Sequence, residues 1–250
     1  MNPVRARSVP LVAVAHGSRD PRSAATVRAL VAKVAEAAPE VDVRVSFLDL
    51  SEPRVTDVLR GLRAEGHREA VVVPLLLGSA YHARVDLPSL AGEVEADTGL
   101  AVSISDVLGT ELETAALDRL IESEVDLRDP RLGIVLAAVG SSNTGANAAV
   151  ASLASRWQAR LGVPVAPAFA GAAKPDVPGA IAKLRAHGAQ HLAVASWFLA
   201  PGLLPDRIAA LAHDVAPDVR IAAPLADHPS VVDVVLRHYA TLANSRAATA

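Results

Sequence analysis

Leu11-Val-Ala-Val-Ala-His16-Gly-Ser-Arg-Asp20 is an apolar run that stops at a histidine, a glycine and several polar residues. A short, wholly aliphatic run ended by glycine is typical of a central strand in a parallel sheet. The segment that follows, 23–38, has apolar residues at helical spacing and ends before Pro39. The stretch therefore predicts a strand and then a helix, with His16 at the carboxyl end of the strand.

Three more strand and helix pairs follow in the first half of the chain. The expected strands are 41–48, 70–77 and 100–104, and the expected helices are 51–64, 87–98 and 111–124. Strands that alternate with helices predict a parallel sheet with helices on both faces. Ligands of such sheets bind beyond the carboxyl ends of the strands, so the residues at those ends are the candidates for function.

The second half of the chain repeats this order. Its expected strands and helices are 132–138, 146–161, a strand that ends at Phe169, a helix that opens at Pro175, 192–199, 204–216 and 230–243. Internal repetition at this length indicates duplication of a whole domain. We therefore predict an α/β fold of two tandem, duplicated domains, 1–125 and 126–250. Each should hold a mostly parallel four-stranded sheet flanked by helices.

Three polar residues follow three successive strands of the first half: His16, Asp49 and His82. When the two halves are overlaid, the counterparts of these residues are Val139, Gly171, and Leu203 or Leu204. A residue needed only for folding should tend to recur, so we interpret the three as one functional set. Two imidazoles and a carboxylate suit Fe(II), Co(II), Ni(II) or Zn(II), and three protein ligands leave positions open for a substrate. An imidazole can also accept a proton near neutral pH.

Each of these residues also has a structural interpretation. A histidine after a buried strand is often only a hydrogen-bonded residue at the rim of the sheet, and Asp49 could cap the next helix. The loop Gly17-Ser-Arg19 could bind an anion at a helix N-terminus. It lacks the glycine spacing of dinucleotide sites and the lysine of a P-loop, so nucleotide binding is disfavoured.

The composition excludes several classes of protein. The 250 residues include no cysteine, which excludes disulfides, thiolate catalysis and cysteine metal sites. The net charge is −3, so there is no basic field for nucleic acid. Apolar runs fall far short of the roughly 20 residues that span a bilayer. We expect a cytoplasmic protein with neither a nucleic-acid nor a membrane partner.

The motifs themselves resemble those of the class II chelatases of the sirohydrochlorin chelatase family, the CbiX/SirB type, in the long two-domain form. The resemblance covers most of the chain. Its motifs are Ala-His16-Gly-Ser-Arg, Phe47-Leu-Asp-Leu-Ser-Glu-Pro53, Tyr81-His82-Ala-Arg-Val-Asp86-Leu-Pro and Phe198-Leu-Ala-Pro-Gly-Leu-Leu-Pro-Asp-Arg-Ile208.

The resemblance implies an ATP-independent lyase that inserts Fe2+, for siroheme, or Co2+, for cobalamin, into sirohydrochlorin with release of two protons. It implies no permanently bound cofactor, and Ni2+ or Zn2+ could serve in vitro. His16 and His82 would hold the metal and assist proton removal. The acidic residue after the second strand is commonly Glu in the family; here Asp49 is one methylene shorter, which leaves direct coordination and action through a water molecule as alternatives.

The carboxylates of sirohydrochlorin need cationic and hydroxyl partners. The candidates are Ser18, Arg19, Arg54, Ser79, Tyr81 and Arg84, although each arginine could instead be solvated surface. The second half would form one wall of the cleft, and because the fused repeat imitates a dimer we expect a monomer. The alternative function is a non-catalytic metal or tetrapyrrole-binding protein. The shorter Asp49 favours that alternative, whereas the presence of both histidines argues against it.

Overall fold

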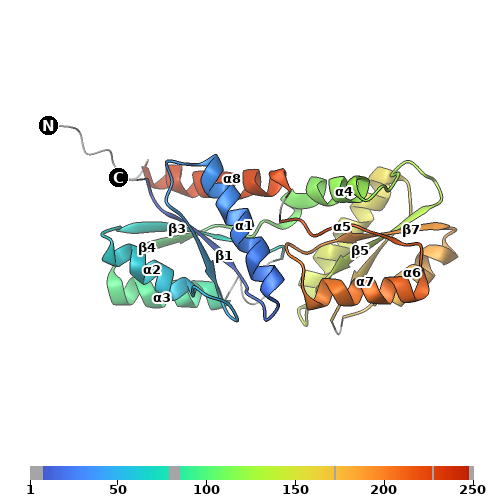
Figure 1. The fold of residues 1–250 in the computed structure, drawn as a ribbon, viewed down its shortest axis with the longest axis horizontal. Helices are drawn as coiled ribbons and strands as arrows, with labels where there is room; N and C mark the ends of the chain where they lie inside the picture. The colour runs from blue at the N-terminus through green and yellow to red at the C-terminus, as the bar shows by residue number, and fades with distance from the viewer. Residues whose placement is uncertain (1–7, 79–84, 172, 227, 248–250) are drawn as a thin grey trace. The chain divides into compact units, whose positions relative to one another are not determined.

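The computed structural model describes residues 8–78, 85–171, 173–226 and 228–247, which form two compact units (Figure 1). The first unit is built from Met1–Leu108 and Val232–Ala250, and the second from Gly109–Val231. Each unit holds a four-stranded sheet whose neighbouring strands all run parallel, which confirms the predicted α/β class and the duplication. Within the described ranges, no helix is long and apolar enough to cross a membrane.

The sheet of the first unit has the strand order β2-β1-β3-β4. Its strands are β1 (Leu11–Ala15), β2 (Val43–Phe47), β3 (Glu69–Pro74) and β4 (Ala101–Ile104). Every residue of β1 is buried, whichever face of the sheet its side chain points to, so both faces are covered. Because the strands are parallel, their carboxyl ends meet at one edge of the sheet.

In the described residues, four helices belong to the first unit. They are α1 (Pro21–Ala37), α2 (Val55–Ala64), α3 (Leu87–Thr98) and most of α8 (Pro229–Ala247). On one face of the sheet, Val12 and Val14 of β1 pack into a buried cluster with Leu59 of α2 and Val94 of α3. These helices present apolar residues every three or four positions, which is the spacing that turns one helical stripe toward a sheet.

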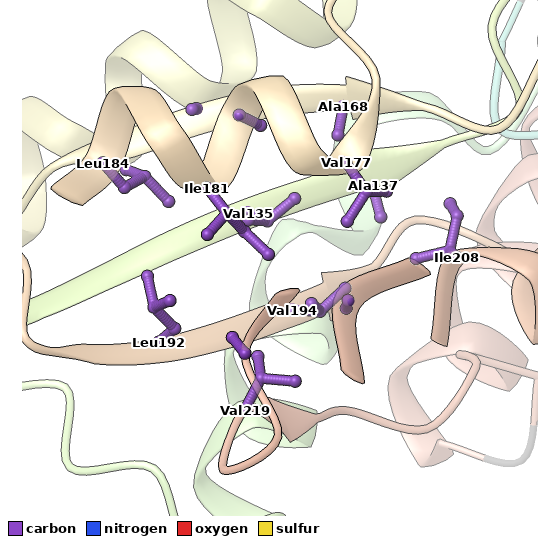
Figure 2. Packing of buried hydrophobic residues seen from close by; sticks show 14 of the residues in the cluster. Val135, Ala137, Ala168, Val177, Ile181, Leu184, Leu192, Val194, Ile208 and Val219 are labelled. Atoms are coloured by element: carbon purple, nitrogen blue, oxygen red, sulfur yellow. The ribbon is translucent and has the colours of Figure 1, made fainter. Parts of the chain in front are cut away.

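The second unit repeats the topology with the strand order β6-β5-β7-β8. Its elements are α4 (Glu113–Glu122), β5 (Leu132–Ala138), α5 (Thr144–Leu161), β6 (Val165–Phe169), α6 (Val177–Ala186), β7 (His191–Ser196), α7 (Leu203–Val215) and β8 (Arg220–Ile221), with a 3-10 turn at Gly109–Leu112. Figure 2 shows the core, where Val135 of β5, Ile181 of α6, Val194 of β7 and Ile208 of α7 point toward one another.

The predicted elements are present, with shifts at their ends. The strand expected over 70–77 ends at Pro74, where the ladder with β1 ends. The helix expected from residue 51 begins at Val55, because the segment before it folds back on β2. In that segment the backbone N–H of Phe47 donates to the carbonyl of Pro53 at 2.9 Å.

The last helix of each sequence repeat lies in the compact unit formed by the other repeat. Helix α4 follows the first four strands in sequence, yet its buried face packs against β7. Helix α8 closes the chain, yet the hydroxyl of Tyr239 donates to the carbonyl of Val9 at 2.7 Å, and His238 Nδ1 lies 3.0 Å from the carbonyl of Asp106. The compact units therefore differ from the sequence repeats 1–125 and 126–250 by an exchange of these helices.

Because α8 packs in the first unit, a substitution in α8 should destabilise that unit and not the second. Replacing Tyr239 by Phe removes the donor to Val9 and should lower the stability of the first unit by about 1 kcal/mol. Hydrogen exchange would report faster amide exchange in β1 and β3 and unchanged exchange in β5 and β7. The matched control is Thr241→Val, since that hydroxyl only donates to Arg237 of the same helix. Loss of protection in the second sheet instead would contradict the assignment of α8 to the first unit.

The core of the second unit gives a stability prediction. Ile181 is 1% exposed within the cluster of Figure 2, so Ile181→Ala should leave a cavity and cost about 2–5 kcal/mol. Ile121 on α4 is 56% exposed, and Ile121→Ala should change stability by less than about 0.5 kcal/mol. Urea unfolding of the two variants beside the parent chain measures both effects. Equal losses would mean that the packing in Figure 2 does not stabilise the unit.

Candidate metal site

His16 and Asp49 are brought together where β1 and β2 end. The parallel pairing of these strands continues past their last residues, since Leu48 N–H donates to Ala15 O and Asp49 N–H donates to His16 O, both at 2.9 Å. His16 is half-buried, and its Nδ1 lies 3.1 Å from the carbonyl oxygen of Gly17. The backbone thus fixes both candidate ligands side by side at the carboxyl edge of the sheet.

A glycine makes this close approach possible. Gly17 has φ +93°, in the left-handed region, and a Cβ built on it would lie 1.7 Å from the carbonyl oxygen of Asp49. Ser18 and Ser51 then join the two loops, because Ser18 N–H donates to Ser51 Oγ and Ser51 Oγ donates to Ser18 O, each at 3.2 Å. Only glycine fits at position 17 without moving Asp49.

The carboxylate of Asp49 is exposed and held by one oxygen. Oδ1 accepts from the backbone N–H of Leu50 and from Arg54 Nη1, each at 2.8 Å. The Leu50 N–H and then the Arg54 guanidinium hold the pKa of Asp49 below its ordinary value. Within the described part of the chain, Oδ2 accepts no hydrogen bond. Asp49 is therefore ionised at neutral pH, with one oxygen available.

The other predicted residues divide into two groups. Ser18 belongs to the loop that joins His16 to Asp49, where its Oγ accepts from Asp20 N–H at 3.0 Å. Arg19 is exposed next to it, and Arg54 is bound to Asp49. Outside the described residues lie His82, Ser79, Tyr81 and Arg84.

Two residues that shape the site were not singled out from the sequence. Ser51 was interpreted only as the start of a helix, although its side chain contacts the His16 loop. Gly17 was interpreted as the end of a strand, although its missing side chain admits Asp49. The recurrence of Gly-Ser at 140–141 of the second repeat was the sequence signal available for the latter.

The second repeat has the same backbone without the polar side chains. Gly171 N–H donates to Val139 O at 2.9 Å, as Asp49 N–H donates to His16 O. This equivalent hydrogen bond confirms that Val139 and Gly171 are the counterparts of the two candidate ligands. The same backbone arrangement is thus present in both repeats, and the candidate ligands are present only in the first.

The predicted counterpart of His82 needs a correction. Leu203 and Leu204 open α7 and therefore match the start of α3, not the segment before it. The link between strand and helix runs over 75–86 in the first repeat and only over 197–202 in the second, so a fixed offset between repeats fails there. Residues 197–202 contain no histidine, and the absence of a counterpart for His82 holds.

A second group of possible metal ligands lies at the opposite edge of the first sheet. Asp42 precedes β2, and Glu65 and His67 precede β3, with ligand atoms within 4.8 Å of one another. Arg44 already binds both carboxylates, with Nε 3.0 Å from Asp42 Oδ1 and Nη1 2.8 Å from Glu65 Oε1. We therefore interpret this group as an ion-pair cluster.

The second unit contains a cavity of about 380 Å³ at the amino ends of its strands. Asp129, His191 and Arg220 contribute to its lining. These residues come from the end of the sheet opposite to Val139 and Gly171, and none of them was among the predicted site residues. The cavity is therefore separate from the constellation of polar residues at the carboxyl edges.

Position 17 gives a testable consequence of this geometry. Gly17→Ala should displace the Asp49 loop and lower stability by more than about 1 kcal/mol, because both φ and the space oppose a side chain. Gly61→Ala is the control, since no atom lies within 4 Å of its Cβ and α2 would gain about 0.5–1 kcal/mol. Thermal unfolding of both variants checks this. A neutral Gly17→Ala would mean that the two loops are not in contact.

Comparison with known proteins identifies the family of this chain. The CbiX family model matches residues 10–123 and 133–242. The sirohydrochlorin ferrochelatase of Bacillus subtilis is 28% identical over 243 residues, which is 93% of this chain and 91% of that protein. The structure of SirB from Bacillus subtilis with Fe3+ is 25% identical, with a TM-score of 0.79, and the match covers 96% of this chain and 98% of that one.

Shorter relatives match one part of the chain. The sirohydrochlorin cobaltochelatase of Methanococcus aeolicus is 31% identical over 91 residues, which is 35% of this chain and 61% of that protein. The matched region thus spans about three fifths of the length of this relative. Because the family match extends across both repeats, the chain belongs to the CbiX family.

Proposed function

We propose that this protein is a sirohydrochlorin chelatase, which inserts a divalent metal into sirohydrochlorin with release of two pyrrole protons. The observation that carries the proposal is the pairing of His16 with Asp49 at the carboxyl edge of the first sheet. The same backbone recurs in the second repeat with Val139 and Gly171, so folding does not require either side chain. The full-length relative from Bacillus subtilis supports the choice of reaction.

The two side chains suit the two tasks of metal insertion. When His16 Nδ1–H donates to the carbonyl of Gly17, Nε2 is the ring nitrogen whose lone pair would hold the substrate metal. Asp49 is ionised, and its free oxygen can bind the metal or accept a pyrrole proton. His82 supplies the second imidazole in this proposal. An open ligand set matters because the metal must leave the protein for the macrocycle.

Cationic side chains near the site would bind the carboxylates of sirohydrochlorin. Arg19 is exposed beside the His16 loop and forms no ion pair with the described residues. It is the described candidate that is free to make bidentate contacts with a carboxylate. Ser18, Ser79, Tyr81 and Arg84 complete the proposed set.

Fe2+ is the proposed physiological metal, and Co2+ is the second choice. The ferrochelatase from Bacillus subtilis matches 93% of this chain, whereas the cobaltochelatase from Methanococcus aeolicus matches 35%. Imidazole and carboxylate ligands do not themselves distinguish the two metals. Initial rates of insertion at matched free-ion concentrations, with Ni2+ and Zn2+ alongside, would establish the preference.

The central test is the loss of His16. His16→Ala should reduce the rate of metal insertion into sirohydrochlorin about 100-fold or more, because both a metal ligand and a proton acceptor are removed. The change in visible absorbance of the macrocycle measures the rate. His187→Ala is the control, since that imidazole only contacts the carbonyl of Lys183 on α6. The same loss is expected for His82→Ala.

The parent chain decides between the two candidate functions. Insertion faster than the spontaneous rate supports the chelatase. Binding of sirohydrochlorin or metal without acceleration would instead establish the non-catalytic binding protein, which the shorter side chain of Asp49 favours. Activity of His16→Ala equal to that of the parent chain would exclude His16 from the site.

A further inference from the structure

We propose that Arg54 is a positioning residue, whose guanidinium holds Asp49 in place, and that it does not bind the substrate. The inference rests on the proposed function, because it assigns a role within the same site. The resemblance to chelatases had suggested Arg54 as a partner of substrate carboxylates. Its contacts within the protein point to a different role.

Arg54 is bound on several sides by its own loop. Its Nη1 donates to Asp49 Oδ1 at 2.8 Å and lies 3.3 Å from the carbonyl of Leu48, and its Nε lies 3.3 Å from Glu52 Oε1. The guanidinium therefore already has two carboxylate partners. A substrate carboxylate would have to displace Asp49 or Glu52 to form a bidentate pair with it.

Arginine is an unfavourable residue at the position that Arg54 occupies. Arg54 is the N-cap residue of α2, and its side chain makes no capping hydrogen bond. The equivalent N-cap of α6 is Asp176, whose carboxylate accepts from Gly179 N–H at 3.0 Å. Aspartate is among the best N-cap residues, whereas arginine has no acceptor to offer. A residue that breaks the local rule in one of two duplicated helices points to a functional demand.

The two repeats also reverse the charges around this helix start. In the first repeat Glu52 pairs with Arg54, and in the second Lys174 pairs with Asp176. The second repeat has Gly171 in place of Asp49, so it has no carboxylate to hold. Arginine thus stands at the N-cap in the repeat that has the candidate ligand, and a true capping residue stands there in the repeat that lacks it.

Orientation, not stability, is what this contact provides. The side chains of Arg54 and Asp49 are 41% and 60% exposed, and ion pairs so accessible to water add little to stability. By fixing Oδ1, Arg54 limits the rotation of the short Asp49 side chain. Oδ2 is then the oxygen that would bind the metal or accept a pyrrole proton. Residues that orient a ligand in this way typically change metal affinity or activity 10- to 100-fold when lost.

The test compares Arg54→Gln with Arg60→Gln, a control on the same helix whose arginine pairs with Asp97. Turnover with saturating sirohydrochlorin should fall about tenfold or more in Arg54→Gln and stay unchanged in the control. The Kd for metal-free sirohydrochlorin, measured by the change in its absorbance, should stay within about twofold of the parent value in both. Arg54→Lys, which keeps the charge and loses the planar fork, should recover only part of the turnover.

A second comparison separates positioning from a merely structural role. In an Asp49→Asn background, Arg54→Gln should lower turnover no further, because the carboxylate that Arg54 orients is absent. Arg54→Asn introduces a side chain that can cap α2. The Tm of this variant should be no lower than that of the parent chain, and its turnover should still fall.

The outcomes are distinguishable. A parent chain that does not accelerate insertion overturns the proposed function. An active parent chain with an Arg54→Gln variant of equal turnover overturns the positioning role alone. A Kd for sirohydrochlorin raised tenfold or more, with turnover at saturation retained, would return Arg54 to substrate binding.

Discussion

The site depends on two backbone hydrogen bonds that continue the β1–β2 pairing beyond the strands. Leu48 N–H to Ala15 O and Asp49 N–H to His16 O keep the two loops parallel for two more residues. They place an imidazole and a carboxylate side by side through backbone hydrogen bonds alone. Gly17 makes this possible, since any Cβ there would collide with the Asp49 carbonyl.

Comparison of the two repeats distinguishes the backbone of the candidate site from its candidate ligands. Both repeats retain the continued pairing and the left-handed glycine, at Gly17 and Gly140, although His16 and Asp49 occur only in the first. The second copy therefore acts as an internal reference for which side chains the fold needs. The same reference supports the proposed role of Arg54, since Asp176 caps α6 in the repeat that lacks Asp49 and Arg54 makes no capping hydrogen bond at the start of α2.

Much of this could be predicted from the sequence, because the pattern is local. Short aliphatic runs alternating with helical spacing predicted the parallel sheets, and overlay of the repeats selected His16 and Asp49. Two features could not be obtained from a fixed offset between the repeats or from sequence order. The counterpart of His82 was misplaced because the link before α7 is shorter. The packing of α4 against β7 could not be predicted, because exchanging two amphipathic helices leaves the hydrophobic pattern of each unchanged.

The sequence by itself determined the α/β class, the duplication and the residues at the strand ends, since these follow from the periodicity of apolar residues and from comparison within the chain. The tertiary structure decided which side chains meet. Arg54 lies five positions after Asp49, and only the folding back of their loop onto β2 turns its guanidinium from solvent to that carboxylate. Such contacts depend on the geometry of the turn between them, which composition and periodicity do not encode.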